Sequence, residues 1–205
     1  MNEAEVFVLA DHALNRIIAQ IRDDQWLMPI PPDFHRRPTP HTPTLREIIN
    51  YLAYDDAWVP DILAGRTMDE VGRDKFDGDL LGEDPKASFA TLVEKACAAA
   101  QALEPADLGR TVHLSFGDFT TADYFQQING FRMLRSVDIG RVIDIKPNLP
   151  DALVQGVWDE ISPRAEQLRK IGVFPQEVPV APEAPLLQRL LGITGRQPTA
   201  TNLRG

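Results

Sequence analysis

The sequence predicts an all-α fold, a DinB-like up-and-down four-helix bundle followed by an extra helical, proline-rich C-terminal segment. Three observations favour it. Apolar residues recur every three or four positions through several long stretches, which is the period of an amphipathic helix. Many of the 17 prolines cluster at residues 29–43 and 175–198, outside these stretches, and proline costs roughly 3 kcal/mol inside a helix. Only residues 111–116 alternate as a strand does.

Composition narrows the class of protein. The 205 residues are 43% hydrophobic, enough for a packed core in one domain or one domain with a tail. A net charge of −9 argues against a general nucleic-acid binder. The single cysteine, Cys97, excludes an intramolecular disulfide and a cysteine metal cluster. The acidic N-terminus lacks a signal-peptide pattern and no apolar run is long enough for a membrane span, so we expect a cytoplasmic protein.

The first two helices have clear signals. Residues 3–21 contain no proline and place apolar side chains at helical spacing. The second helix starts at Thr44, because Thr44 and Glu47 form a capping box in which each side chain can bond the other's backbone N–H. Its apolar stripe continues to Leu63, and Gly65 is a plausible stop.

The remaining elements follow from similar signals. After an acidic, glycine-containing loop at residues 74–82, Asp84-Pro85 opens a third helix. Thr120 or Thr121 caps a fourth helix that runs to about Ile143, and a fifth extends from Pro150 to Gly172. Residues 186–193 form a short amphipathic piece. We therefore expect a helical domain at residues 1–172 and a proline-rich tail with a short helix at residues 173–205.

The four histidines do not form a metal-ligand pattern. They are His12, His35, His41 and His113, with no i,i+4 pair and no HExxH. His113 is the most interesting, because in an alternating segment it shares a face with Thr111 and Ser115. It is a candidate acid, base or hydrogen-bond donor. The alternative is a loop histidine bonded to a backbone carbonyl.

Polar and aromatic side chains accompany the apolar stripes of two helices. They are Tyr51, Asp55 and Trp58 on the second helix, and Phe131, Arg135 and Asp138 on the fourth. Charged groups in a helical core must be paired, because an unpaired buried charge costs several kcal/mol. One interpretation is a structural salt-bridge network or a solvated helix edge. The other is a small polar pocket between the two helices, with Arg135 as an anion clamp.

Several segments resemble a bacterial family. Residues 44–50 (TLREIIN) and 58–65 (WVPDILAG) are similar to the second helix of mycothiol-dependent maleylpyruvate isomerase-like proteins, within the DinB-like helical bundles. Residues 112–117, 137–141 and 190–198 resemble the later helix and closing segment of that family, so the likeness covers most of the chain. The resemblance implies a four-helix bundle whose divalent metal is held by a histidine on the second helix and by a Glu and a His at i,i+4 on the later helix. Such a metal would activate a carbonyl or a thiol such as mycothiol.

The ligand positions of that family hold other residues in this chain. The second-helix histidine falls on Tyr51, the glutamate on Phe131 and the later histidine on Arg135. A guanidinium repels a cation, so we expect a degenerate metal site and no metal. Tyr51, Arg135, Asp138 and Asp55 are expected where the metal centre would be.

Three hypotheses for the function follow. In the first, the protein is a metal-independent enzyme or small-molecule binder in which Arg135 binds a carboxylate and Asp138 orients Arg135. Tyr51 and His113 would donate a proton or a hydrogen bond. The walls of the pocket would be Asp55, Trp58 and Phe131. In the second, the chain is a non-catalytic structural or interaction protein that dimerises through its helices. In the third, a metal- or thiol-dependent isomerase or transferase uses a non-standard ligand set such as His113 with Asp55 or Asp138. We expect a small-molecule partner, neither nucleic acid nor membrane, and leave a mycothiol-like cosubstrate and a homodimer open.

Overall fold

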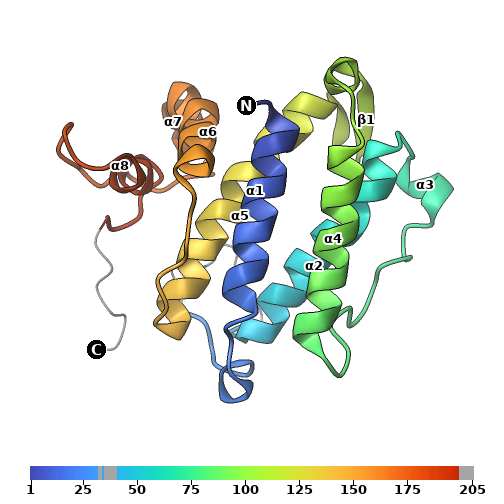
Figure 1. Ribbon diagram of the computed structural model, residues 1–205, viewed down its shortest axis with the longest axis horizontal. Coiled ribbons are helices and arrows are strands. Elements are labelled where there is room, and N and C mark those ends of the chain that lie inside the picture. Colours follow the sequence, from blue (N-terminus) through green and yellow to red (C-terminus); the bar gives the residue numbers. More distant parts are fainter. Residues whose placement is uncertain (32–33, 35–40, 199–205) are drawn as a thin grey trace.

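The structure, a computed structural model that describes residues 1–31, 34 and 41–198, contains four long helices (Figure 1). They are α1 (Glu3–Ile18), α2 (Leu45–Leu63), α4 (Pro85–Gln101) and α5 (Thr121–Ile143). Each begins at a side-chain cap, and such caps contribute about 1 kcal/mol. The cap residues are Asn2, Thr44, Asp84 and Thr120, each accepting a hydrogen bond from a backbone N–H three residues later. The capping signals at Thr44, Asp84 and Thr120 are therefore confirmed.

The four helices do not alternate in direction. Helices α1 and α5 run in the same direction. Asn129 Nδ2 of α5 donates to the carbonyl of Glu3 at the start of α1 at 2.9 Å. Near the other end of α1, Arg16 donates to the Asn148 carbonyl, which follows α5, at 3.4 Å. Arg46, at the start of α2, donates to the Gly82 carbonyl just before α4 at 2.7 Å. In Figure 1, α1 and α5 accordingly run downward while α2 and α4 run upward. The chain thus differs from the simple up-and-down order with short connections that the sequence predicts, because residues 64–84 carry it back along α2 before α4 begins.

Helix α1 lies between α5 and α4, and α4 packs in turn against α2. Fully buried side chains from all four helices form the first hydrophobic core: Phe7, Leu14, Ile49, Phe89 and Phe125 are among the largest. The rings of Phe7 and Phe125 are 5.2 Å apart. Burying each such side chain contributes about 1.5–3 kcal/mol, so this core supplies much of the drive for folding.

A β-hairpin and three short helical segments connect these helices. The hairpin pairs β1 (Thr111–Leu114) with β2 (Gly117–Thr120), and η2 (Pro105–Gly109) precedes it. Two smaller elements, η1 (Asp23–Gln25) and α3 (Met68–Val71), precede and follow α2. Residues 111–114 of the alternating run at 111–116 are confirmed as extended, and its last two residues, Ser115 and Phe116, form the turn of the hairpin. Thr121 fastens the hairpin to α5 by donating from its backbone and hydroxyl to the Arg110 carbonyl.

The predicted fifth helix is interrupted. It consists of α6 (Asp151–Ile161), η3 (Ser162–Arg164) and α7 (Ala165–Lys170). Pro163 explains the break, because it has no N–H for the helical ladder. The short amphipathic piece is confirmed as α8 (Leu186–Ile193).

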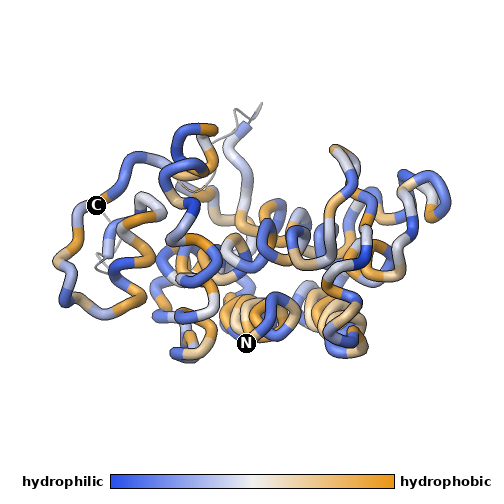
Figure 2. The backbone as a smooth tube through the Cα atoms, turned by 90° about the horizontal axis from the view of Figure 1, so that it is seen from above, coloured by the Kyte–Doolittle hydropathy of each residue, from blue (hydrophilic) through white to orange (hydrophobic). Residues whose placement is uncertain are grey.

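The C-terminal helices pack on the other side of α1 and α5. A second hydrophobic core joins them to those helices; it includes Ala10, Met133, Leu153, Val157 and Leu190. In Figures 1 and 2 this part of the chain occupies one end of the molecule. Figure 2 also shows hydrophobic and hydrophilic residues alternating around the helices, as amphipathic packing requires. Within the described residues, no helix is long and apolar enough to cross a membrane.

Two glycines of α5 give a test of this packing. A Cβ at Gly140 would collide with the Ile145 carbonyl, which is backbone and cannot rotate away, and would lie 3.0 Å from Pro147 Cδ. A Cβ at Gly130 would approach side chains alone, most closely the flexible end of Ile161 at 2.6 Å, and would be in ordinary contact with Val157 at 3.8 Å. We expect Gly140→Ala to lower the free energy of unfolding by about 2 kcal/mol. Because alanine favours a helix by about 1 kcal/mol, Gly130→Ala should stay within about 1 kcal/mol of wild type. Denaturant unfolding of both variants checks this, and equal losses would contradict it.

Candidate functional site

A cavity of about 580 Å³ lies between α2 and α5 and is bordered by the hairpin and by the segment around α7. Five of the seven site residues predicted from the sequence line it: Tyr51, Asp55, Trp58, His113 and Phe131. Arg135 and Asp138 are not among its lining residues. The structure therefore brings together the second-helix group, His113 and Phe131, and places the predicted anion clamp elsewhere.

Exposed apolar surface is concentrated around this cavity. Six large apolar or aromatic side chains are exposed in the described part of the chain, and four of them line the cavity. These four are Tyr51, Phe116, Phe131 and Ile171, with exposed fractions of 60%, 69%, 48% and 67%. Exposed apolar surface carries a cost in water, so its concentration around one concave site indicates a binding surface.

A buried ion cluster stands behind the cavity. Arg132 of α5 donates from Nε to Asp11 Oδ1 of α1 at 3.0 Å and from Nη2 to Asp56 Oδ1 of α2. All three side chains are buried, and the guanidinium also lies over the Phe7 ring, 4.8 Å from its centroid. Arg132 itself lines the cavity. The cluster thus ties three helices together at the inner side of the cavity.

The sequence contained a signal for this cluster that the prediction missed. Asp11 stands four residues after Phe7 and three before Leu14, which are both fully buried on one face of α1. Asp56 interrupts the apolar stripe of α2 in the same way, and Arg132 interrupts that of α5. A charged residue on an apolar stripe is buried with its helix face and must find a partner there. Because Asp11 and Asp56 are negatively charged and Arg132 is positively charged, the pattern indicates that these three side chains pair.

The protonation of the cluster is set by burial and by mutual repulsion. Burial raises the pKa of Asp11 well above its usual range, and the neighbouring Asp56 raises it further, while Arg132 acts in the opposite direction. Burial also raises the pKa of Asp56. For Arg132, burial disfavours the charge, but Asp56 and Asp11 outweigh it, so the pKa of the guanidinium is raised. Arg132 therefore stays charged, and the two carboxylates compete for it.

Asp55 lies next to this cluster on the cavity wall. No hydrogen bond or ion pair joins its carboxyl to the residues that the structure describes. Burial raises the pKa of Asp55 to about 6, with Arg132 lowering it and Asp56 raising it. On the same wall, the indole N–H of Trp58 is buried without a partner in the described chain. The wall thus contains both a carboxyl group that titrates near neutral pH and an unmet hydrogen-bond donor.

His113 is held by a carboxylate, not by a backbone carbonyl. Its Nδ1 lies 2.8 Å from Oδ1 of Asp118, the residue directly opposite in the hairpin. When a carboxylate accepts the proton of Nδ1, the neutral ring keeps Nε2 as a proton acceptor. Of the other histidines, His41 contacts Glu47 on the exposed start of α2 and His12 lies on α1. His35 lies outside the described residues.

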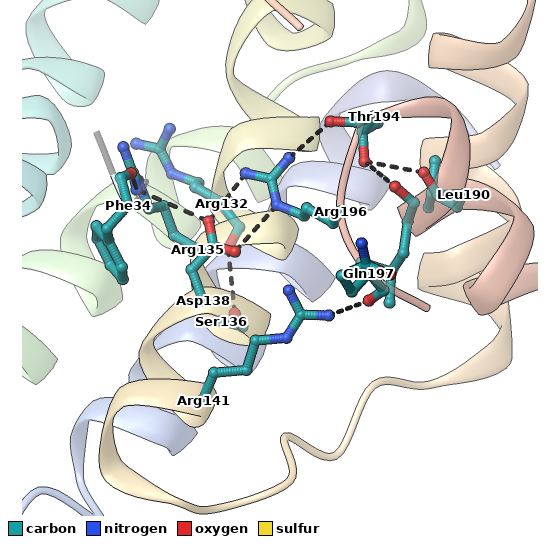
Figure 3. A network of polar contacts seen from close by, with 11 residues as sticks. Phe34, Arg132, Arg135, Ser136, Asp138, Arg141, Leu190, Thr194, Arg196 and Gln197 are labelled. Carbon is teal, nitrogen blue, oxygen red and sulfur yellow. Dashed lines mark hydrogen bonds and ion pairs between the residues drawn. The ribbon is translucent and has the colours of Figure 1, made fainter. Parts of the chain in front are cut away.

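Arg135 and Asp138 belong to a second polar cluster, which fastens the C-terminal segment to α5 (Figure 3). Arg135 Nη1 donates to the Phe34 carbonyl at 2.5 Å, and its guanidinium lies 4.6 Å from the centroid of the Phe34 ring. Asp138 Oδ2 is 3.7 Å from Arg135 but 2.9 Å from Arg196 Nη2, and Asp138 Oδ1 accepts from Arg196 Nε at 3.0 Å. Asp138 thus holds mainly Arg196, and the pair does not face the cavity.

The residues present do not fit the divalent metal that the family resemblance implies. Its three ligand positions hold Tyr51, Phe131 and Arg135, none of which is a carboxylate, histidine or cysteine. Nowhere in the described ranges do three His, Cys, Asp or Glu side chains come together as a metal site. Asp11 and Asp56 are the nearest approach to a cation cage, and a guanidinium lies between them. The alternative set of His113 with Asp138 is also not assembled, because Asp138 lies in the other cluster.

Comparison with known proteins finds no match among protein-family models, curated proteins or solved structures. The family resemblance therefore stays an expectation from the sequence.

Replacing Arg132 tests the buried cluster. We expect Arg132→Met to lower the free energy of unfolding by about 3–5 kcal/mol, because it leaves two buried carboxylates without a counter-charge. Adding Asp11→Asn should restore part of that loss. The matched control is Arg73→Met, which removes an exposed i,i+4 pair with Asp69 and should leave the free energy of unfolding close to that of wild type. Denaturant unfolding measures all three, and similar losses for Arg132 and Arg73 would exclude the structural role.

The raised pKa of Asp55 makes stability depend on pH with a definite sign. The folded protein holds this proton up to about pH 6, whereas an unfolded chain releases it near pH 4. The folded state binds more protons between these values, so the free energy of unfolding falls as pH rises from about 4 to about 6. In Asp55→Asn this fall should shrink by at most about 3 kcal/mol. Asp11 and Asp56 act in the same direction in both proteins, so parallel stability curves would show that Asp55 has an ordinary pKa.

Proposed function

We propose that this protein binds a small organic molecule in the cavity between α2 and α5 and acts as a metal-independent enzyme or binding protein on a DinB-like four-helix bundle. The observation that carries the proposal is the gathering of exposed aromatic and apolar side chains around a single cavity whose wall also holds titratable groups. Pockets for small molecules combine these features, namely an apolar lining and a few polar groups that orient the ligand.

The cavity has groups suited to proton transfer. Asp55, with a pKa of about 6, can change its protonation state near neutral pH. His113, held at Nδ1 by Asp118, offers Nε2 as a base. Tyr124 also lines the cavity, and burial raises its pKa, so it stays a neutral hydrogen-bond donor. General acid–base chemistry on a bound molecule is the reaction type that these residues support.

The proposed fold rests on the four long helices and on the sequence segments that resemble the family. Helices α1, α2, α4 and α5 enclose one apolar core, and the charged cluster links three of them. In such bundles, ligand sites are built from side chains on facing helices. A thiol cosubstrate such as mycothiol would have to enter the same cavity.

A non-catalytic interaction protein is the second candidate. The exposure of Tyr51, Phe116, Phe131 and Ile171 also suits a homodimer in which a second copy covers the cavity mouth. The mass of the protein in solution separates the two cases. A dimer that dissociates in Phe116→Ser would favour the interaction protein.

Truncating the cavity mouth tests small-molecule binding. A thermal-shift screen with small aromatic and apolar compounds should find ligands that raise the melting temperature of the wild type. Phe131→Ala should weaken their binding by about tenfold, since the ring is worth roughly 1–3 kcal/mol of contact. Leu27→Ala is the matched control, because Leu27 is also an exposed apolar side chain, at 73%, and lies outside the cavity. Equal responses in both variants would contradict the proposal.

A further inference from the structure

We propose that the cavity accepts an organic cation, a protonated amine with an aromatic or apolar body, and that Asp55 holds its ammonium group. This inference rests on the proposed function and specifies the class of ligand.

The charged groups of the cavity differ in what they already contact. Arg132 is engaged by Asp11 and Asp56, and Arg66 by Asp61 at 3.2 Å. Arg164 donates from Nε to the Glu160 carbonyl at 2.9 Å and from Nη2 to the Gln126 carbonyl. The carboxyl of Asp55, in contrast, is joined to none of the described residues by a hydrogen bond or ion pair. The cavity's cations thus have acceptors within the protein, and its anion is available to a ligand.

The charge balance immediately around Asp55 favours a cation as well, and Arg132 and Asp56 are the charged groups that act on its pKa. Behind Asp55 stand two carboxylates, Asp11 and Asp56, and one guanidinium, Arg132. With Asp55 ionised, three negative groups share one positive charge, and even with one proton on the Asp11–Asp56 pair the excess stays negative. An ammonium group would correct this imbalance, whereas a carboxylate would increase it. A carboxylate ligand was the expectation from Arg135, but that side chain lies in the other polar cluster.

The remaining lining suits an amine with a flat or apolar body. Seven phenylalanine, tyrosine and tryptophan side chains line the cavity: Tyr51, Tyr54, Trp58, Phe116, Tyr124, Phe131 and Phe174. Aromatic faces attract organic cations through the ring quadrupole, and they pack against a hydrocarbon body. The buried indole N–H of Trp58 is a second unmet group on the wall and could serve a hydroxyl or carbonyl of the same ligand.

A matched set of three probes tests the charge preference. They are 2-phenylethylamine, 2-phenylethanol and 3-phenylpropanoate, which share a body and differ in charge. Binding is followed by the ¹⁵N-resolved indole resonance of Trp58, assigned by its loss in Trp58→Phe. The resonances of Trp26 and Trp158, which do not line the cavity, report unspecific effects. We expect the amine to bind at least about tenfold more tightly than the alcohol, as a desolvated charge pair allows.

Two variants and a pH series assign the effect to Asp55. Asp55→Asn should remove the advantage of the amine and leave the alcohol unchanged, while Asp24→Asn, at an exposed carboxylate outside the cavity, should change neither. From about pH 8 to about pH 5, wild type should lose about tenfold in amine affinity, because Asp55 becomes protonated. The groups around it are Asp56 on α2, Arg132 and Tyr124 on α5, Arg66 after α2, and His113 on β1. Their titration is common to wild type and Asp55→Asn, so the difference between the two isolates Asp55.

The outcomes separate this inference from the proposed function. If the alcohol or the carboxylate binds as tightly as the amine, the cation preference is wrong while small-molecule binding stands. If the amine binds but Asp55→Asn keeps its advantage, the assignment to Asp55 is wrong. If none of the three probes shifts Trp58, the inference fails, and the thermal-shift screen with Phe131→Ala decides the proposed function separately.

Discussion

The pairing of one guanidinium with two carboxylates inside the protein is the constraint on which the other features depend. Arg132 reaches from α5 to Asp11 on α1 and to Asp56 on α2, so three helices must take up one mutual position to satisfy a single charge. An ion moved out of water is costly unless its partners are well placed, and a misaligned helix would leave one of these groups alone. The cluster therefore contributes specificity of packing more than net stability. It also sets the electrostatic character of the cavity beside it.

That character follows from an unequal count of charges. Arg132 cannot neutralise Asp11, Asp56 and Asp55 together, and the result is a set of carboxyl groups whose pKa values are raised by burial and mutual repulsion. Perturbed titratable groups on a cavity wall are the usual companions of binding and catalysis, because they hold or transfer a proton at a defined place. The aromatic side chains at the mouth of the cavity supply contact area, and the carboxyl groups on its wall orient the charged part of a ligand. The two together make a site in which shape and charge act on different parts of one ligand.

The sequence predicted local features well and spatial ones less well. Helix starts depend on neighbours a few residues away, so Thr44, Asp84 and Thr120 identified them, and the bounds of α8 followed from its apolar spacing. The direction of α4 depends on the path of residues 64–84, which no local pattern encodes. Tyr51, Asp55 and Trp58 of α2, and His113 of the hairpin, do line one cavity. Arg135 was assigned there by alignment with metal ligands, whereas the helical phase of α5 turns Arg132 inward instead.

The polar cluster at Asp138 has a consequence for the chain as a whole. Phe34, from the connection that precedes α2, and Arg196, which follows α8, are both anchored on one turn of α5 through Arg135 and Asp138. The segment before α2 and the segment after α8, which are distant in the sequence, thereby attach to the same turn of α5. Detaching one deprives the other of a neighbour, so their opening equilibria are linked, and a shortened C-terminus would speed amide exchange at Phe34.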